Sequence, residues 1–442
     1  MRLNILASSL ITLIGVFSVS SVMAQTANLT QIYDKAQSRD AVIATANSSY
    51  AAGKEKANQG LALLLPNVSV SGAYADTYYK DDLSVPDGKR AESTSATLTV
   101  VQPLYNGNYF ASYRQGKLAA SQAKENLTLA EQDLIIRVAQ SYFNVLSAQE
   151  SVRVAEAQKR AFSENLDRAK LTFKVGTATI TDKLEAQARY DLAIAEEIAA
   201  SNALEVARQS LASIIGELPP ALADLKADAT LPQLSPVDMN EWISRAKANS
   251  PMLKVAQQSV AISREELSKA RSGHMPTLSF VANATQQDSY SYQASADNVS
   301  DTYSVAVQLQ MPIFAGGMAM SQVREAHAMR DGARAQLDQT ERTVVLQTQQ
   351  AYLAVANGRL RVQALQQALA SNQSAVDATK KGLEVGVRTN LDLLNAQQQF
   401  FATQRDLAVA KYNYLLDTLR LKSATGILLP ADLNDINQLL QG

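Results

Sequence analysis

Four short segments of the chain alternate between apolar side chains and polar or small ones with a period of two. The alternation is clear at 96–103 and 304–311 and weaker at 67–74 and 277–284. Because successive side chains of a β-strand point to opposite faces, we expect four strands with one apolar face and one small or polar face. Such strands fit the wall of a membrane barrel between lipid and water, and the alternative is a half-buried sheet in a soluble protein.

Tyrosines gather near the expected strand ends, as an interfacial aromatic belt requires. They are Tyr74, Tyr78, Tyr79, Tyr290, Tyr292 and Tyr303. The polar segments 80–93 and 286–301 then form loops on the outer side of the membrane. Four short strands cannot close a barrel, and an open sheet edge is not tolerated in lipid. We therefore expect a barrel shared between several copies of the chain, and the strand pattern leaves their number open.

Two proline-free stretches of more than 110 residues, 104–218 and 313–429, follow the strand pairs. Since a proline costs about 3 kcal/mol in a helix interior, these stretches favour helix. Apolar or small residues recur every three to four positions at Leu127, Ala130, Leu134, Val138, Ser141, Val145, Ala148, Val152 and Ala155. One helix between Gly116 and Gly176 would be about 90 Å long. We therefore expect antiparallel helical hairpins that reverse at 175–177 and 385–387.

The second half of the chain follows the first at a shift of 210 residues. Pro66 lies over Pro276, Tyr142 over Tyr352, Val175-Gly176 over Val385-Gly386, and Asp182 over Asp392. Agreement at one fixed shift over so much of the chain indicates a tandem duplication. We expect each copy to contain a helix, two strands, a very long helix, a turn and another helix, with the copies at 25–238 and 239–442.

The N-terminus has the three parts of a secretory signal peptide. Arg2 is the positive region, residues 5–22 are largely apolar, and Val22-Met23-Ala24 fits the small-x-small cleavage pattern. We expect residues 1–24 to be removed, and a retained N-terminal anchor is the alternative. No other stretch has the ~20 apolar residues of a membrane helix, so further entry into a membrane is expected to use the strands.

Composition excludes several classes of site. The chain has no cysteine, which rules out lipoprotein anchoring, disulfides and cysteine-bound metals. Its formal net charge of −1 implies no general attraction to nucleic acid. His274 and His327 lie far apart in sequence, and the chain contains no catalytic constellation or phosphate-binding glycine loop. We expect no enzyme activity, no cofactor and no metal site.

Several motifs resemble those of the TolC family of outer-membrane efflux proteins. They are LLP at 64–66, AQSYFNVL at 139–146, FKVGTATITD at 173–182, GHMPTL at 273–278, PIFAGGM at 312–318, SQV at 321–323 and KYNYL at 411–415. The resemblance covers essentially the whole expected mature chain. It implies a mainly α fold with a small membrane β-barrel. Tandem-duplicated long helical hairpins would form a trimeric twelve-helix tunnel in the periplasm, and four strands per protomer would share a twelve-stranded barrel in the outer membrane.

The function that the resemblance implies is that of a passive exit duct in tripartite efflux or type I secretion. The expected partners are two further copies of the chain, a periplasmic membrane-fusion adaptor and an inner-membrane transporter of the RND, ABC or MFS type. A periplasmic coiled-coil adaptor or scaffold protein is the alternative, and the two pairs of alternating strands argue against it. The cargo stays open among drugs, metals, other small molecules and proteins.

The resemblance also locates the entrance constriction of the tunnel just past the second turn. Asp392 matches a family position whose carboxylates form a ring from three chains, whereas Asn395 stands where the family usually has another Asp. Like charges disfavour ionisation, so we expect a raised pKa for Asp392 and a cation preference set by its ring. The alternative is that Asp392, like Asp182, only occupies a first helical turn, where the helix dipole favours a carboxylate.

Links between the hairpins are expected to hold the entrance closed. The resemblance assigns these links to Thr181, Asp182 and Arg388, while Leu383 stands where the family commonly has a tyrosine. One hydrogen bond, worth roughly 0.5–1.5 kcal/mol, is then missing per protomer, so closure should depend more on Arg388. Glycine permits the chain to reverse at each turn. The resemblance makes the same turns, at Val175, Gly176, Val385 and Gly386, the docking points of the adaptor.

Overall fold

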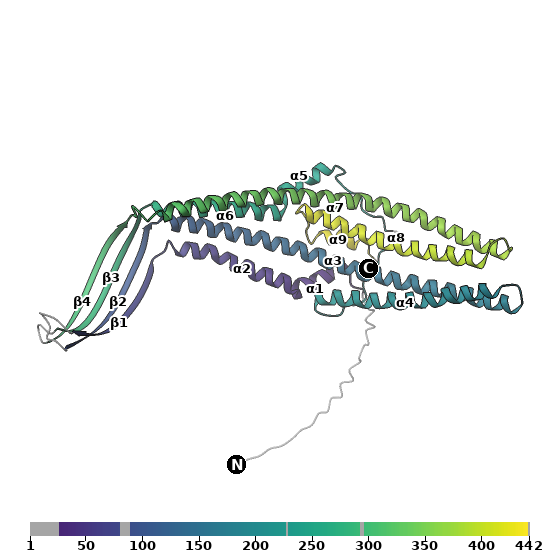
Figure 1. Ribbon diagram of the computed structural model, residues 1–442, viewed down its shortest axis with the longest axis horizontal. Coiled ribbons are helices and arrows are strands. Elements are labelled where there is room, and N and C mark those ends of the chain that lie inside the picture. Colours follow the sequence, from purple (N-terminus) through teal and green to yellow (C-terminus); the bar gives the residue numbers. More distant parts are fainter. Residues whose placement is uncertain (1–25, 80–88, 227–228, 292–295, 441–442) are drawn as a thin grey trace, which may run out of the picture.

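The computed structural model describes residues 26–79, 89–226, 229–291 and 296–440. The expected signal peptide lies outside the described residues, as do parts of both expected strand-connecting loops and the side chains of Tyr79, Tyr290 and Tyr292. The molecule is elongated, with the strands at one end and two helical hairpins at the other (Figure 1).

The same order of elements occurs twice, as the 210-residue shift predicts. The first set is α1 (Leu29–Arg39), α2 (Ala41–Ala62), β1 (Asn67–Tyr79), β2 (Lys89–Tyr105), α3 (Gly107–Lys174) and α4 (Ile180–Ile215). The second is α5 (Met239–Asn249), α6 (Pro251–Arg271), η1 (Ser272–His274), β3 (Thr277–Ser291), β4 (Ala296–Gln310), α7 (Met318–Glu384) and α8 (Asn390–Ala424). The short helix α9 (Asp432–Asn437) follows.

The single helix expected before each strand pair is in fact two helices. In the first copy the break lies at Asp40, which ends α1 and caps α2 by accepting a hydrogen bond from the Ile43 amide over 2.9 Å. In the second copy it lies at Ser250, before Pro251 at the first position of α6. Aspartate at a cap and proline at the first helical position both favour the start of a new helix.

The long helices start earlier than the glycine spacing suggests. α3 begins at Gly107 and keeps Gly116 in its interior, for a length of about 100 Å. A Cβ atom at Gly116 would lie 2.3 Å from the carbonyl oxygen of Lys56 in α2. Gly116 therefore permits the close approach of two helices and does not mark a helix boundary.

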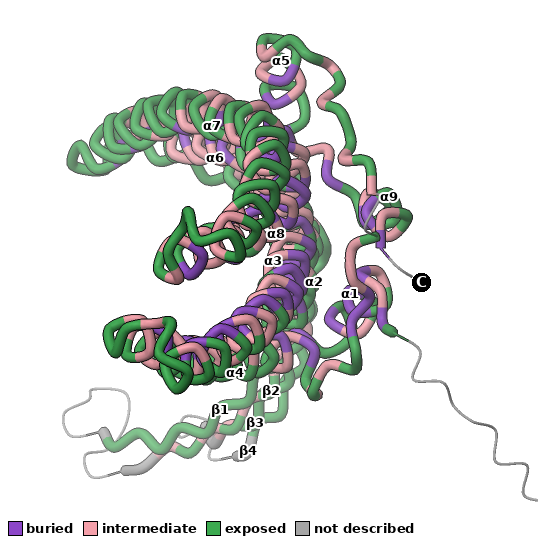
Figure 2. The backbone as a smooth tube through the Cα atoms, turned by 90° about the vertical axis from the view of Figure 1, so that its right-hand side faces the viewer, coloured by how far each residue is buried: buried purple, intermediate pink, exposed green. Residues whose placement is uncertain are grey.

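The helices form a curved layer whose concave side is open (Figure 2). α3 packs against α2 on the strand side and against α4 on the hairpin side, and α7 packs against α6 and α8 in the same way. The short helices α1, α5 and α9 lie on the convex side, where the main hydrophobic core is buried. Within it, Tyr142 donates hydrogen bonds to the carbonyl oxygens of Ala223 and Ala27 over 2.7 and 3.2 Å.

The four strands form one antiparallel sheet in the order β1-β2-β3-β4. The register aligns apolar or aromatic positions with one another across the sheet, as in the row Val70, Leu98, Ala284 and Tyr303. The next row, on the opposite face, is Ser71, Thr97, Thr285 and Thr302. The two copies thus contribute the same pattern to the same two faces, which confirms the expected alternation.

The strands are longer than the alternation predicts. β2 begins at Lys89, β3 runs to Ser291 and β4 begins at Ala296, so much of the two expected loops is strand. Antiparallel pairing uses backbone groups, and it continues where polar side chains replace the alternating ones. No helix in the part of the chain that the structure describes is long and apolar enough to cross a membrane.

Candidate functional site

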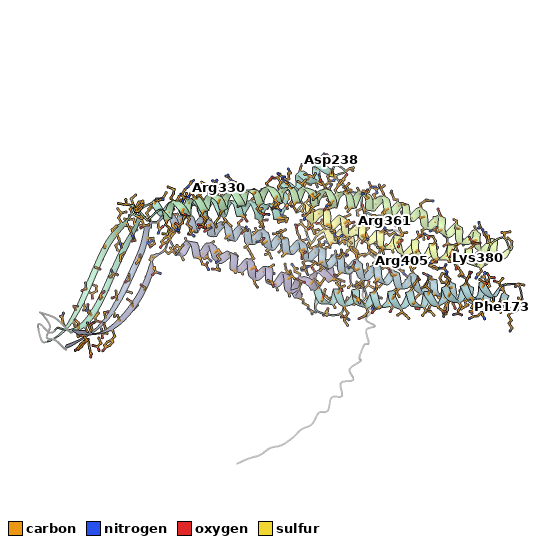
Figure 3. All side chains as sticks on the ribbon, viewed as in Figure 1. Phe173, Asp238, Arg330, Arg361, Lys380 and Arg405 are labelled. Atoms are coloured by element: carbon orange, nitrogen blue, oxygen red, sulfur yellow. The ribbon has the colours of Figure 1, made fainter. Side chains whose placement is uncertain are left out.

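The ends of the two helical hairpins have the same backbone geometry. Gly176 and Gly386 both have φ +79°, a left-handed conformation that glycine adopts without strain. The Gly176 amide donates to the Phe173 carbonyl over 3.1 Å, and the Gly386 amide donates to the Leu383 carbonyl over 3.2 Å. Val175 and Val385 are exposed beside them. Figure 3 labels Phe173 at the end of the first hairpin and Lys380 near the end of the second.

Asp182 and Asp392 lie in the first turns of α4 and α8, the returning helices of the two hairpins. The Thr389 amide donates to the Asp392 carboxylate over 3.0 Å, and the Asp392 amide donates to the Thr389 hydroxyl over 3.1 Å. Thr179 and Asp182 form the same reciprocal pair in the first hairpin, at 3.0 and 3.1 Å. Both carboxylates therefore belong to capping boxes, which satisfy amides that a helix start leaves unpaired.

The electrostatic setting of Asp392 within one protomer favours its charged form. Hydrogen bonds from the Thr389 backbone and side chain, together with the nearby Arg388 cation, hold the pKa of Asp392 below its ordinary value. This direction is opposite to the one expected for a ring of three like charges. Asn395, one turn further along α8, is exposed and accepts a hydrogen bond from Arg189 over 2.9 Å.

A groove of about 540 Å³ lies between the ends of the two hairpins. Asp182, Leu383 and Arg388 all line it, so the structure brings these three predicted residues together, while exposed Thr181 is not among the lining residues. Among the described residues, Asp182 hydrogen-bonds with Thr179, and no hydrogen bond or ion pair joins Arg388 to Thr181 or Asp182. The Arg388 Cγ instead lies close to Gly382, where a Cβ atom would be 2.7 Å away.

Asn390 is a further residue of this groove that sequence reasoning missed. It is the first residue of α8, and its side-chain Nδ2 is buried with no hydrogen-bond partner in the described part of the protein. A buried amide donor left unpaired costs about 1–3 kcal/mol. The groove thus carries an unsatisfied donor beside the cation of Arg388.

The two hairpins of one chain are joined further from their ends. Leu394 of α8 is fully buried in a second hydrophobic cluster, whose other members come from α3 and α4: Phe162, Leu166, Ala169, Ala186 and Ala193. Polar contacts lie beside it, because Asn165 donates to Gln397 over 2.5 Å and Arg189 donates to Asn395 and Gln398. Sequence reasoning found only Asn395 of this set, since the partners lie about 200 residues apart and carry no motif.

His274 belongs to η1 and His327 to α7. The Nε2 of His327 lies 3.3 Å from the Nη2 of Arg271. Within the described ranges, no cluster of three or more histidine and acidic side chains could hold a metal ion.

Comparison with known proteins gives one consistent family. The family model described as "Outer membrane efflux protein" matches residues 32–217 and again 242–427, with the same offset as the duplication. The chain is 32% identical to outer membrane protein TolC of Escherichia coli (strain K12), over 95% of this chain and 86% of that protein. It is 31% identical to the alkaline protease secretion protein AprF of Pseudomonas aeruginosa, over 91% of this chain and 85% of that protein.

Solved structures agree in fold. The Campylobacter jejuni CmeC outer membrane channel superimposes with a TM-score of 0.80 at 17% identity, over 99% of this chain and 97% of that one. The relatives and structural neighbours are outer-membrane channels for efflux and secretion. With both halves matched by the family model and relatives above 30% identity along nearly its whole length, this chain belongs to the outer membrane efflux protein family and is an exit channel of the outer membrane.

Proposed function

We propose that three copies of this chain form one duct, in which the sheets close a shared barrel and the curved helical layers close a tunnel. The sheet supports this most directly. One of its faces carries exposed apolar side chains such as Val70 and Val305, and its outer strands β1 and β4 have no neighbour within the described protomer. Unpaired strand edges are costly in lipid, so each edge needs a strand from another copy.

The duct carries its cargo by passive permeation, driven by an inner-membrane transporter of the RND, ABC or MFS type through a periplasmic membrane-fusion adaptor. The efflux family model and the protease secretion relative both fit this description, since substrate choice belongs to the transporter. The exposed turns at Val175, Gly176, Val385 and Gly386 are the surfaces that the adaptor meets. Their exposure and matching geometry in both hairpins support this role.

The entrance lies at the hairpin ends, where Asp392 from each copy faces the permeating ions. The low pKa of Asp392 in the protomer supports a charged ring at neutral pH. Arg388, Asp182, Thr181 and Leu383 restrain the hairpins around the groove when the duct is closed. Opening then requires the hairpins to separate, while the buried core near α1 and α9 stays intact.

Cross-linking tests the shared barrel. Because the chain has no cysteine, any disulfide must come from introduced residues. One cysteine is placed on β1 and one on β4, on the same face, in a scan of Val68 and Val70 against Val305 and Val307. At one register we expect oxidation to link chains in threes on a denaturing gel. A matched pair on β1 and β3, which are not neighbours in the sheet, serves as the control. Chains that stay unlinked at every register, or dimers alone, would rule out the closed trimer.

A further inference from the structure

Arg189 connects the two hairpins through one side chain. It belongs to α4, and its Nη2 donates to the Oδ1 of Asn395 over 2.9 Å while its Nη1 donates to the side-chain oxygen of Gln398. Asn395 and Gln398 are three residues apart and so lie on one face of α8. The planar guanidinium therefore holds two acceptors that are one helical turn apart.

The surroundings of Arg189 are packed. Leu394, next to Asn395, is fully buried against Phe162 and Leu166 of α3 and Ala186 of α4. Asn165 is itself buried and donates to Gln397 over 2.5 Å. The face of α8 that Arg189 contacts is thus fixed against the first hairpin by apolar and polar contacts. Arg189 is half-buried there and is not a solvated side chain that meets an acceptor by chance.

The position of Arg189 also changes the charge near Asp392. Asp392 precedes Asn395 by three residues, which is about 4.5 Å along the axis of α8. The Arg189 cation, bonded to Asn395, therefore lies within about one Debye length of the Asp392 carboxylate. Asn395 adds no charge of its own. Each protomer then brings the positive charge of Arg189 to this level of the duct, in addition to Arg388 and the negative charge of Asp392.

We propose that Arg189 holds the two hairpins together and sets the ion selectivity of the entrance. Because of its positive charge, this duct has no strong preference for cations. The inference rests on the proposed function, in which Asp392 lines the entrance. It adds a residue from the first hairpin, whose positive charge, together with that of Arg388, opposes the negative charge of Asp392. Permeating anions then meet no net negative barrier at this level.

The test is the reversal potential of the purified duct in a planar bilayer across a potassium chloride gradient. Arg189→Gln removes the cation and should raise the K⁺/Cl⁻ permeability ratio about threefold. The same change should raise the resting conductance, because the hairpins lose a link. Arg189→Lys keeps the charge but cannot hold two acceptors in the same planar geometry, so the ratio should stay near that of wild type while the conductance rises.

Arg208→Gln is the matched control. Arg208 also belongs to α4 but is exposed, and it makes no hydrogen bond or ion pair within the described residues. Its replacement removes the same charge at a distance of nearly 30 Å along the helix. Neither selectivity nor conductance should change. Equal shifts in Arg208→Gln and Arg189→Gln would mean that only the overall charge of the helix matters, and would overturn the proposal.

Asp392→Ala separates failure of this inference from failure of the proposed entrance. If it shifts selectivity toward anions while Arg189→Gln leaves the ratio unchanged, the entrance stands and the role of Arg189 is wrong. If neither variant changes the ratio, the entrance does not lie at Asp392. A ratio that rises in Arg189→Lys as much as in Arg189→Gln would also contradict the assigned role, since the charge is kept.

Discussion

Arg137 of α3 holds Asp40 with two nitrogens, at 2.8 Å from Nη1 to Oδ2 and 3.0 Å from Nη2 to Oδ1. Asp40 is buried, and the same carboxylate caps α2. The pair therefore fixes the break between α1 and α2 against the long helix of the same repeat. The second repeat has Ser250 at the corresponding break, and Ser250 makes no side-chain capping bond.

Asp40→Ala should lower the free energy of unfolding by about 3 kcal/mol, because it removes a helix cap and leaves Arg137 without its buried counter-charge. Ser250→Ala, its counterpart in the second repeat, should change stability by less than about 0.5 kcal/mol. The measurement is the thermal unfolding midpoint of both variants at one fixed scan rate. Similar shifts in the two variants would show that the Asp40–Arg137 pair contributes little.

The same pair predicts a pH dependence. The hydrogen bond from Arg137 holds the pKa of Asp40 below its ordinary value. A carboxyl with a lowered pKa stabilises the fold above its unfolded pKa of about 3.9, and this stability is lost as the pH falls through the lower folded value. The difference in midpoint between wild type and Asp40→Ala should therefore be constant near neutral pH and shrink below about pH 4. A difference that grew on acidification would contradict the assignment.

Gly116→Ala tests the close approach of α2 and α3. The added methyl would lie 2.3 Å from the Lys56 carbonyl oxygen, so one of the two backbones must move. We expect a loss of about 1–3 kcal/mol, as for overpacking in a core. Gly332→Ala in α7 is the control, since its Cβ meets no described atom within 4 Å and alanine favours helix. Chemical or thermal unfolding of both variants gives the comparison, and a neutral Gly116→Ala would refute the tight contact.

Thr389→Ala tests what keeps Asp392 ionised. The Thr389 hydroxyl and amide both hydrogen-bond in the capping box, and they lower the pKa of Asp392. Without the hydroxyl, the Asp392 pKa should rise, and the pH at which the permeability ratio changes should move upward with it. Thr389→Ser keeps the hydroxyl and should behave like wild type. The pH dependence of the reversal potential measures this shift. Identical curves for all three proteins would show that the Thr389 hydroxyl does not control the ionisation of Asp392.

Arg388→Ser tests the restraint at the hairpin ends. Arg388 lines the groove opposite Asp182 and lies against Gly382 of its own hairpin. We expect a larger resting single-channel conductance in this variant, because the groove between the hairpins loses a cationic side chain from its lining. Lys380→Ser removes a nearby exposed charge of α7 outside the groove and should leave conductance unchanged. An unaltered conductance in Arg388→Ser would contradict a restraining role for Arg388. The hairpins would then be held together only by the contacts of Leu394, Asn165 and Arg189.

Local sequence patterns predicted most of the elements of the fold. The two turns were predictable from Gly176 and Gly386, because the positive φ of each turn favours glycine. The strand pairs were predictable from the alternation of their side chains. The helix break at Asp40 could also have been read from its capping preference. The contacts between the two hairpins could not be predicted from local sequence patterns. Arg189, Asn165 and Leu394 meet partners far away in sequence, and nothing in their neighbours indicates which face of α4 or α3 will meet α8.

The most direct test of a trimeric duct with its entrance at Asp392 is block of single-channel current by a trivalent cation added to one side of a bilayer. For wild type inserted in one orientation, we predict stable conductance that is blocked from the hairpin side and not from the strand side. In Asp392→Ala the block should be lost while the channel still inserts. Block that is equal from both sides, or that survives in Asp392→Ala, would contradict this account of the entrance.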